Sequence, residues 1–141
     1  MSKGLMDYVQ SAMGNIKTAD VAEAKELIAA GYKILDVREP GEYLTAAIPG
    51  AINIPRGVLE PAADLNYPGA NPALRDARDA DWLVVCKSGG RAALATQTLQ
   101  EMGFDNVVNM IGGMDAWTES GGDTEIPSGE NSTVVLKEPC I

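Results

Sequence analysis

The segment VVCKSGGRAALATQTLQEMGF, from Val84 to Phe104, constrains the fold more than any other part of the chain. DWLVVC is an apolar run that predicts a buried strand, and GRAALATQTLQEM predicts a helix directly after a loop with two glycines. In parallel α/β sheets, the loops that follow the carboxyl ends of strands carry the ligand sites. Cys86 lies at such a junction and is therefore the leading candidate for a functional residue.

The rest of the chain also alternates between predicted helices and predicted strands. Apolar residues at helical spacing predict a helix over 6–16 and a second that is capped by Thr18 or Asp20 and stops at Gly31. Residues 113–120 predict a final helix. Strands are expected at four short apolar runs, residues 33–38, 51–55, 81–86 and 106–111. Strands that alternate with helices imply a mainly parallel sheet covered on both faces.

Two segments have less regular patterns. Residues 56–81 are rich in Pro, Ala, Asn and Asp and predict a long ordered loop with one helical turn, anchored by Tyr67 and Leu74. The composition turns polar after Gly121, which predicts a tail that could dock through Val134–Leu136. We therefore expect a helical extension at 1–15, one domain at 16–121 and a polar tail at 122–141.

Composition excludes several classes of function. The net charge of −9 argues against a nucleic-acid partner, and no apolar run approaches the roughly 20 residues of a membrane helix. The absence of an export signal and the presence of only two cysteines, Cys86 and Cys140, predict a cytoplasmic protein with reduced thiols. The chain has no histidine, so Cys–His and Ser–His–Asp mechanisms are excluded and a zinc site is not expected. We expect neither a metal nor a cofactor.

The loop after Cys86 has the features of an anion site. Helix N–H groups after Gly90 point back at the loop and favour the thiolate over the thiol. Gly89 and Gly90 allow successive backbone N–H groups to converge, and Lys87 and Arg91 add positive charge. The simpler interpretation is a small buried cysteine in a tight turn, with both cations merely solvated.

Loop length indicates which anion the site takes. Protein tyrosine phosphatases have a similar strand–Cys–loop–Arg–helix arrangement, in which the loop is one residue longer. A shorter loop closes a smaller ring, which favours a sulfur atom on Cys86 over a phosphoryl group. Four residues stand between Cys86 and Arg91: Lys87, Ser88, Gly89 and Gly90.

Three ordered motifs resemble one known family. ILDVREPGEYLTAAIPGAINIP, CKSGGRA and MIGGMDAWTESG are similar to the successive signatures of single-domain rhodaneses, which are thiosulfate or persulfide sulfurtransferases. The resemblance covers roughly 16–121. The chain departs from the family pattern at Ala46-Ala47, where family members usually carry Gly-His.

The resemblance implies a rhodanese-like three-layer α/β fold with a mostly parallel five-stranded sheet flanked by helices on both faces. It also implies a sulfurtransferase that moves a sulfane sulfur from thiosulfate, a polysulfide or a persulfide to a thiol or cyanide through a Cys86 persulfide. Backbone N–H groups from Lys87 to Arg91 are expected to hold the terminal sulfur. We expect Lys87 to attract the anionic donor and Arg91 to bind backbone carbonyls, with the opposite assignment as the alternative. Ser88 is a further candidate for contact with the substrate.

Several residues outside the loop are candidates for supporting roles. Asp36 and Arg38 could support the site, although an ion pair with a purely structural role fits equally well. Glu42 could pair with Arg38 or be a solvated turn residue. Trp117 is expected to fill the core between the last helix and the sheet. Gly112-Gly113 predict a tight turn beside the active-site loop.

Two alternatives remain beside the enzyme. The first is a relay module that carries persulfide to a protein acceptor and turns over thiosulfate weakly. The second is a phosphatase or arsenate-reductase-like enzyme, which the short loop disfavours. Cys140 is either an incidental thiol or one that resolves the Cys86 persulfide as a disulfide.

Overall fold

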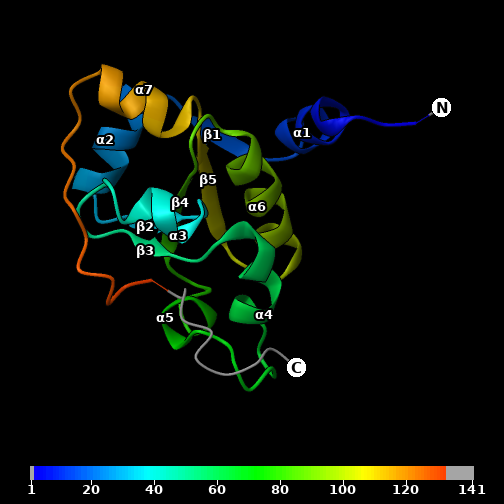
Figure 1. The fold of residues 1–141 in the computed structure, drawn as a ribbon. Coiled ribbons are helices and arrows are strands. Elements are labelled where there is room, and N and C mark those ends of the chain that lie inside the picture. The colour runs from blue at the N-terminus through cyan, green and yellow to red at the C-terminus, as the bar shows by residue number, and fades with distance from the viewer. Residues whose placement is uncertain (1, 133–141) are drawn as a thin grey trace.

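The computed structural model describes residues 2–132. Its centre is a five-stranded sheet in the order β1-β5-β4-β2-β3, and every pairing between these strands is parallel (Figure 1). The expected fold class is therefore confirmed. The strands are β1 Lys17–Ala19, β2 Lys33–Asp36, β3 Ile52–Asn53, β4 Asp81–Val85 and β5 Asn106–Met110.

Helices cover both faces of the sheet and complete three layers. The side chains of α4, α5 and α6 belong to the core on one face, and those of α2, α3 and α7 belong to the core on the other. The remaining long helix, α1, packs on the outside of α6 (Figure 1). The helices are α1 Leu5–Met13, α2 Val21–Ala29, α3 Pro40–Tyr43, the 3-10 turn η1 Arg56–Val58, α4 Leu59–Ala63, α5 Pro72–Arg75, α6 Gly90–Glu101 and α7 Gly113–Glu119.

The central strand β4 shows why the sheet is buried on both sides. Trp82 and Val84 belong to the core beneath α6, whereas Leu83 and Val85 belong to the opposite core, and all four are at most 1% exposed. Successive side chains of a strand point to opposite faces, so a continuous apolar run needs two cores. Cys86 continues the alternation on the side of Trp82 and Val84.

The start of the domain differs from expectation. The first helix was expected over 6–16, but it ends at Met13 and is followed by β1, which the sequence did not predict. The three residues of β1 have no apolar pattern, and their strand exists because β5 pairs with it, for example Thr18 with Asn109. Asp20 caps α2, as one of the two expected caps.

Residues 56–81 hold more helix than the single turn that was expected, because η1, α4 and α5 all lie there. Leu74 is fully buried and anchors the segment as predicted, whereas Tyr67 is only half-buried. Leu59, which was not singled out, is equally buried and is the second anchor.

The first part of the expected polar tail packs on the domain. Residues 122–132, called the strap below, run past the Ala47 segment to the free edge of β3 (Figure 1). The backbones of Ala47 and Glu125 exchange two hydrogen bonds of 2.9 and 2.8 Å, and the Asn53 N–H donates to the Asn131 carbonyl at 2.8 Å. The strap thus covers an otherwise unpaired strand edge.

The predicted docking segment Val134–Leu136 and Cys140 lie outside the described residues. Within residues 2–132, no helix has both the length and the apolar character needed to cross a membrane.

Candidate active site

Cys86 follows the last residue of β4 and opens a loop that ends in the first turn of α6. Its side chain is buried, and the Gly89 N–H donates to Sγ at 3.0 Å. Gly89 caps α6 with a φ of +112°, a conformation that side-chain-bearing residues rarely adopt. The N–H groups in the first turn of a helix lack partners within it, and the N–H of the Gly89 cap is the one that contacts the sulfur.

A second helix holds the loop from the other side. The N–H groups of Met114 and Asp115, in the first turn of α7, donate to the carbonyls of Cys86 at 2.8 Å and Lys87 at 3.0 Å. A Cβ at Gly113 would clash with both carbonyl oxygens, and Gly113 has a φ of +56°. The predicted turn beside the loop is thus confirmed, and its glycine allows this close approach.

Arg91 makes a different contact from the one expected. Its guanidinium donates two hydrogen bonds of 2.8 and 3.1 Å to the Glu42 carboxylate of α3, rather than binding backbone carbonyls. The expected pair between Glu42 and Arg38 is therefore wrong. Hydrogen bonding to Arg91 lowers the pKa of Glu42. The same bond raises the pKa of Arg91, and the negative charge of Glu42 acts in the same direction.

Lys87 and Ser88 follow Cys86 in the loop, and both are exposed. The Lys87 Nζ contacts the Asp115 carboxylate at 3.2 Å. Lys87 is therefore ion-paired, and its expected attraction for anions stays a prediction, as do the substrate contacts assigned to Ser88.

Asp36 and Arg38 form a buried ion pair at the end of β2, with an Nη2–Oδ2 distance of 2.8 Å. Arg38 Nη2 also donates to the Ala46 carbonyl at 2.7 Å. This contact fixes the segment in which Ala46-Ala47 replaces the usual Gly-His. The geometry fits a structural role for the pair, because the Arg38 guanidinium already donates hydrogen bonds to the Asp36 carboxylate and to the Ala46 carbonyl.

The sequence did not single out Asp115, and it assigned Glu42 to another partner. Both residues lie inside the quoted motifs, but separation along the chain could not reveal which cation each carboxylate meets. Within residues 2–132, no group of three or more His, Cys, Asp or Glu side chains is placed to hold a metal ion.

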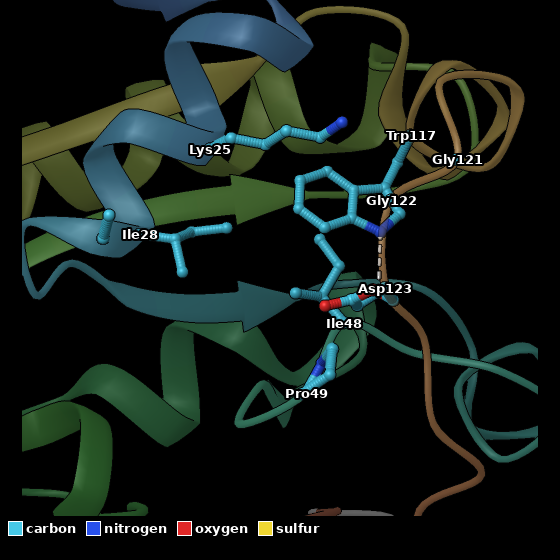
Figure 2. Close-up of a pocket in the computed structure, with 9 residues that line it drawn as sticks. Lys25, Ile28, Ile48, Pro49, Trp117, Gly121, Gly122 and Asp123 are labelled. Carbon is cyan, nitrogen blue, oxygen red and sulfur yellow. Dashed lines mark hydrogen bonds between the residues drawn. The ribbon is translucent and has the colours of Figure 1, made fainter.

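A cavity of about 440 Å³ lies between α2, α7 and the Ile48-Pro49 segment, and none of its lining residues comes from the Cys86 loop (Figure 2). Trp117 forms one wall and is 4% exposed, so its predicted place in the core is confirmed. Its Nε1 donates to the Asp123 carbonyl at 2.8 Å (Figure 2). Lys25 Nζ lies 5.6 Å from the centre of a Trp117 ring.

Known proteins resemble the chain over most of its length. The human protein "Thiosulfate:glutathione sulfurtransferase" is 33% identical over 113 residues, which cover 76% of this chain and 97% of that protein. "Putative sulfur carrier protein YrkF" of Bacillus subtilis is 39% identical over 86 residues, covering 60% of this chain and 40% of that protein. The chain thus spans less than two thirds of some relatives that it matches.

A solved structure from Rhodopseudomonas palustris superposes with a TM-score of 0.82 at 33% identity, covering 89% of this chain and 96% of that one. It is described as a protein of unknown function and "Possible Tyrosine Phosphatase". The sequence profile named "Rhodanese-like domain" matches residues 20–120. With this match, the parallel sheet and the relatives of similar sequence, the chain belongs to the rhodanese-like family.

Proposed function

We propose that this protein is a sulfurtransferase that carries a sulfane sulfur as a persulfide on Cys86. The observation that carries the proposal is the contact of 3.0 Å from the Gly89 N–H to Sγ at the start of α6. Donors that already face the sulfur stabilise a charged sulfur without reorganisation. Only four residues separate Cys86 from Arg91, which suits a small ring of donors around sulfur better than around a phosphoryl group.

In the first step, the Cys86 thiolate attacks the outer sulfur of thiosulfate. A new S–S bond forms at Cys86 while the S–S bond of thiosulfate breaks, and sulfite leaves with the electron pair. A persulfide donor reacts in the same way and leaves as a thiolate. The terminal sulfur of Cys86–S–S⁻ then accepts hydrogen bonds from the loop, and such charge-assisted bonds contribute about 1.5–3 kcal/mol each.

In the second step, a thiolate or cyanide attacks the terminal sulfur, and the Cys86 thiolate leaves. The products are a new persulfide or thiocyanate. Because sulfite and thiolates leave as stable anions, neither step needs a general acid, which agrees with a chain without histidine. A thiol is our leading acceptor because a relative is named for transfer to glutathione.

The experiment is to incubate the purified protein with thiosulfate and to measure its mass. We expect a gain of one sulfur atom that disappears on addition of cyanide. Cys86→Ser should neither gain sulfur nor produce thiocyanate, and conversion of cyanide by this variant would contradict the proposal. Cys140 supplies the control, because Cys140→Ser should load and discharge normally.

The sulfur-relay module is the second candidate, supported by the resemblance to a protein named as a sulfur carrier. Loading without rapid discharge to cyanide or small thiols would favour it over the enzyme. A phosphatase remains an outcome of the same test, because hydrolysis of an aryl phosphate without any sulfur loading would overturn both sulfur hypotheses. The cytoplasmic location stays a prediction.

A further inference from the structure

Each cation of the Cys86 loop is paired with a carboxylate from a different element. Lys87 contacts Asp115 of α7 at 3.2 Å, and Arg91 contacts Glu42 of α3 at 2.8 Å. Each pair combines one positive and one negative charge, so neither cation of the loop is uncompensated, in a chain whose net charge is −9. An approaching dianion therefore meets little attraction from these side chains.

The two ion pairs differ in their burial and in their hydrogen-bond geometry. The Arg91–Glu42 pair is bidentate and about two-thirds buried, so loss of Glu42 would disturb the loop itself. The Lys87 and Asp115 side chains are 62% and 55% exposed, which leaves Lys87 in solvent when its partner is changed. The Asp115 backbone is nevertheless held beside the loop, because its N–H donates to the Lys87 carbonyl.

We propose that Asp115 determines the charge preference of the site for its sulfur donor: by neutralising Lys87, it disfavours dianionic thiosulfate relative to a donor with a single negative charge, such as cysteine persulfide. The inference rests on the proposed sulfurtransferase function. Coulomb energy is proportional to the charge on the donor, so a freed ammonium group attracts the dianion more strongly than the monoanion. Asp115 acts only through Lys87 and touches no reacting atom.

Asp115→Asn tests the inference through kcat/KM for the two donors. We expect the value for thiosulfate to rise about three- to tenfold, the value for cysteine persulfide to rise about half as much on a logarithmic scale, and the thiosulfate gain to disappear in high salt. Glu119→Gln is the matched control, because it removes the same charge from the same helix one turn farther from the loop.

Double substitution separates charge from packing. If charge decides, kcat/KM for thiosulfate should be highest for Asp115→Asn and lowest for Lys87→Gln. The wild type and the Asp115→Asn/Lys87→Gln double variant have the same net charge at this pair, so their values should be similar and lie between the two. Equal gains for both donors, a gain matched by Glu119→Gln, or a gain that survives high salt would overturn the inference. Failure of the wild type to load sulfur at Cys86 would instead refute the proposed function itself.

Discussion

Arg91 and Glu42 are 49 positions apart in the chain, yet their side chains join the Cys86 loop to α3. This contact orients a cation whose pKa is raised chiefly by the hydrogen bond to Glu42. At the residue scale, the site is a sulfur that accepts a backbone hydrogen bond from Gly89, in a loop whose two cations are both ion-paired. Substitutions at Glu42 and Gly113 test the contacts that hold this loop.

Glu42→Gln should remove an acid-sensitive part of stability. The pKa of Glu42 is below its usual 4.5 in the folded protein because Arg91 binds the ionised form. A lowered folded pKa means that the contribution is complete above 4.5 and is lost as the pH falls through the lower, folded value. We expect the difference in unfolding temperature between wild type and Glu42→Gln to shrink on acidification through this window. A difference independent of pH, or one equal to that of Glu119→Gln, would contradict the assignment.

Gly113→Ala should displace the Cys86 loop. The added Cβ would clash with the Cys86 and Lys87 carbonyls at a position that already has a positive φ. We expect a loss of about 3 kcal/mol in unfolding free energy and a strong fall in sulfur loading. Gly121→Ala is the matched control, since Gly121 has a φ of +77° but no neighbour within 4 Å of its Cβ position. Chemical denaturation measures the unfolding free energy of both variants, and equal losses for Gly113→Ala and Gly121→Ala would refute the packing argument.

At the element scale, α1 extends the layer that covers the active-site helix. Val9 and Ala12 are buried against Ala93 of α6, and a Cβ at Gly90 would lie 3.6 Å from Val9 Cγ2. The N-terminal helix therefore packs directly on the first turn of α6, which follows the Cys86 loop.

Ala12→Glu should undock α1 from α6. Ala12 is 1% exposed, so the substitution forces a carboxylate into an apolar contact, and we expect a loss of about 2–4 kcal/mol in unfolding free energy. Ser11→Glu introduces the same charge at the neighbouring exposed position and should change stability by less than about 0.5 kcal/mol. Thermal or urea unfolding compares the stability of Ala12→Glu with that of Ser11→Glu, and similar losses for the two variants would argue against the packing of α1 on α6.

At the scale of the whole molecule, the strap links distant parts of the domain. It accepts a bond from Trp117 at Asp123, pairs with Ala47 at Glu125, and reaches the edge of β3 at Asn131. The domain boundary expected at 121 stays a prediction, although these bonds tie residues beyond it to the sheet.

A chain cut after Gly122 should unfold more easily and should associate through the uncovered β3 edge. At about 1 kcal/mol per lost hydrogen bond, we expect a loss of roughly 2–4 kcal/mol. A chain that lacks only residues 133–141 keeps every strap contact described here and serves as the control. Unfolding temperature and size-exclusion chromatography measure the effects, and identical behaviour of the two truncated chains would show that the strap contributes nothing.

The sequence predicted most elements, and the failures have physical causes. The apolar run of β4 can satisfy its side chains only inside a sheet with two cores, so that strand was evident. β1 has no such pattern, and it forms because the edge of β5 supplies hydrogen-bond partners. Leu59 was missed because single helical turns in a segment rich in Pro and Ala depend on burial against the sheet rather than on local periodicity.

For the candidate site, the sequence by itself determined that a cysteine at the end of a strand is followed by glycines, an arginine and a helix. Those features depend on local backbone geometry, which neighbouring residues largely specify. Only the tertiary structure decided that Glu42 meets Arg91, that Asp115 meets Lys87, and that α7 holds the loop through its backbone. These contacts join residues that the fold brings together across 28 to 49 positions, and the spacing of residues along a chain carries no information on which distant charges become neighbours.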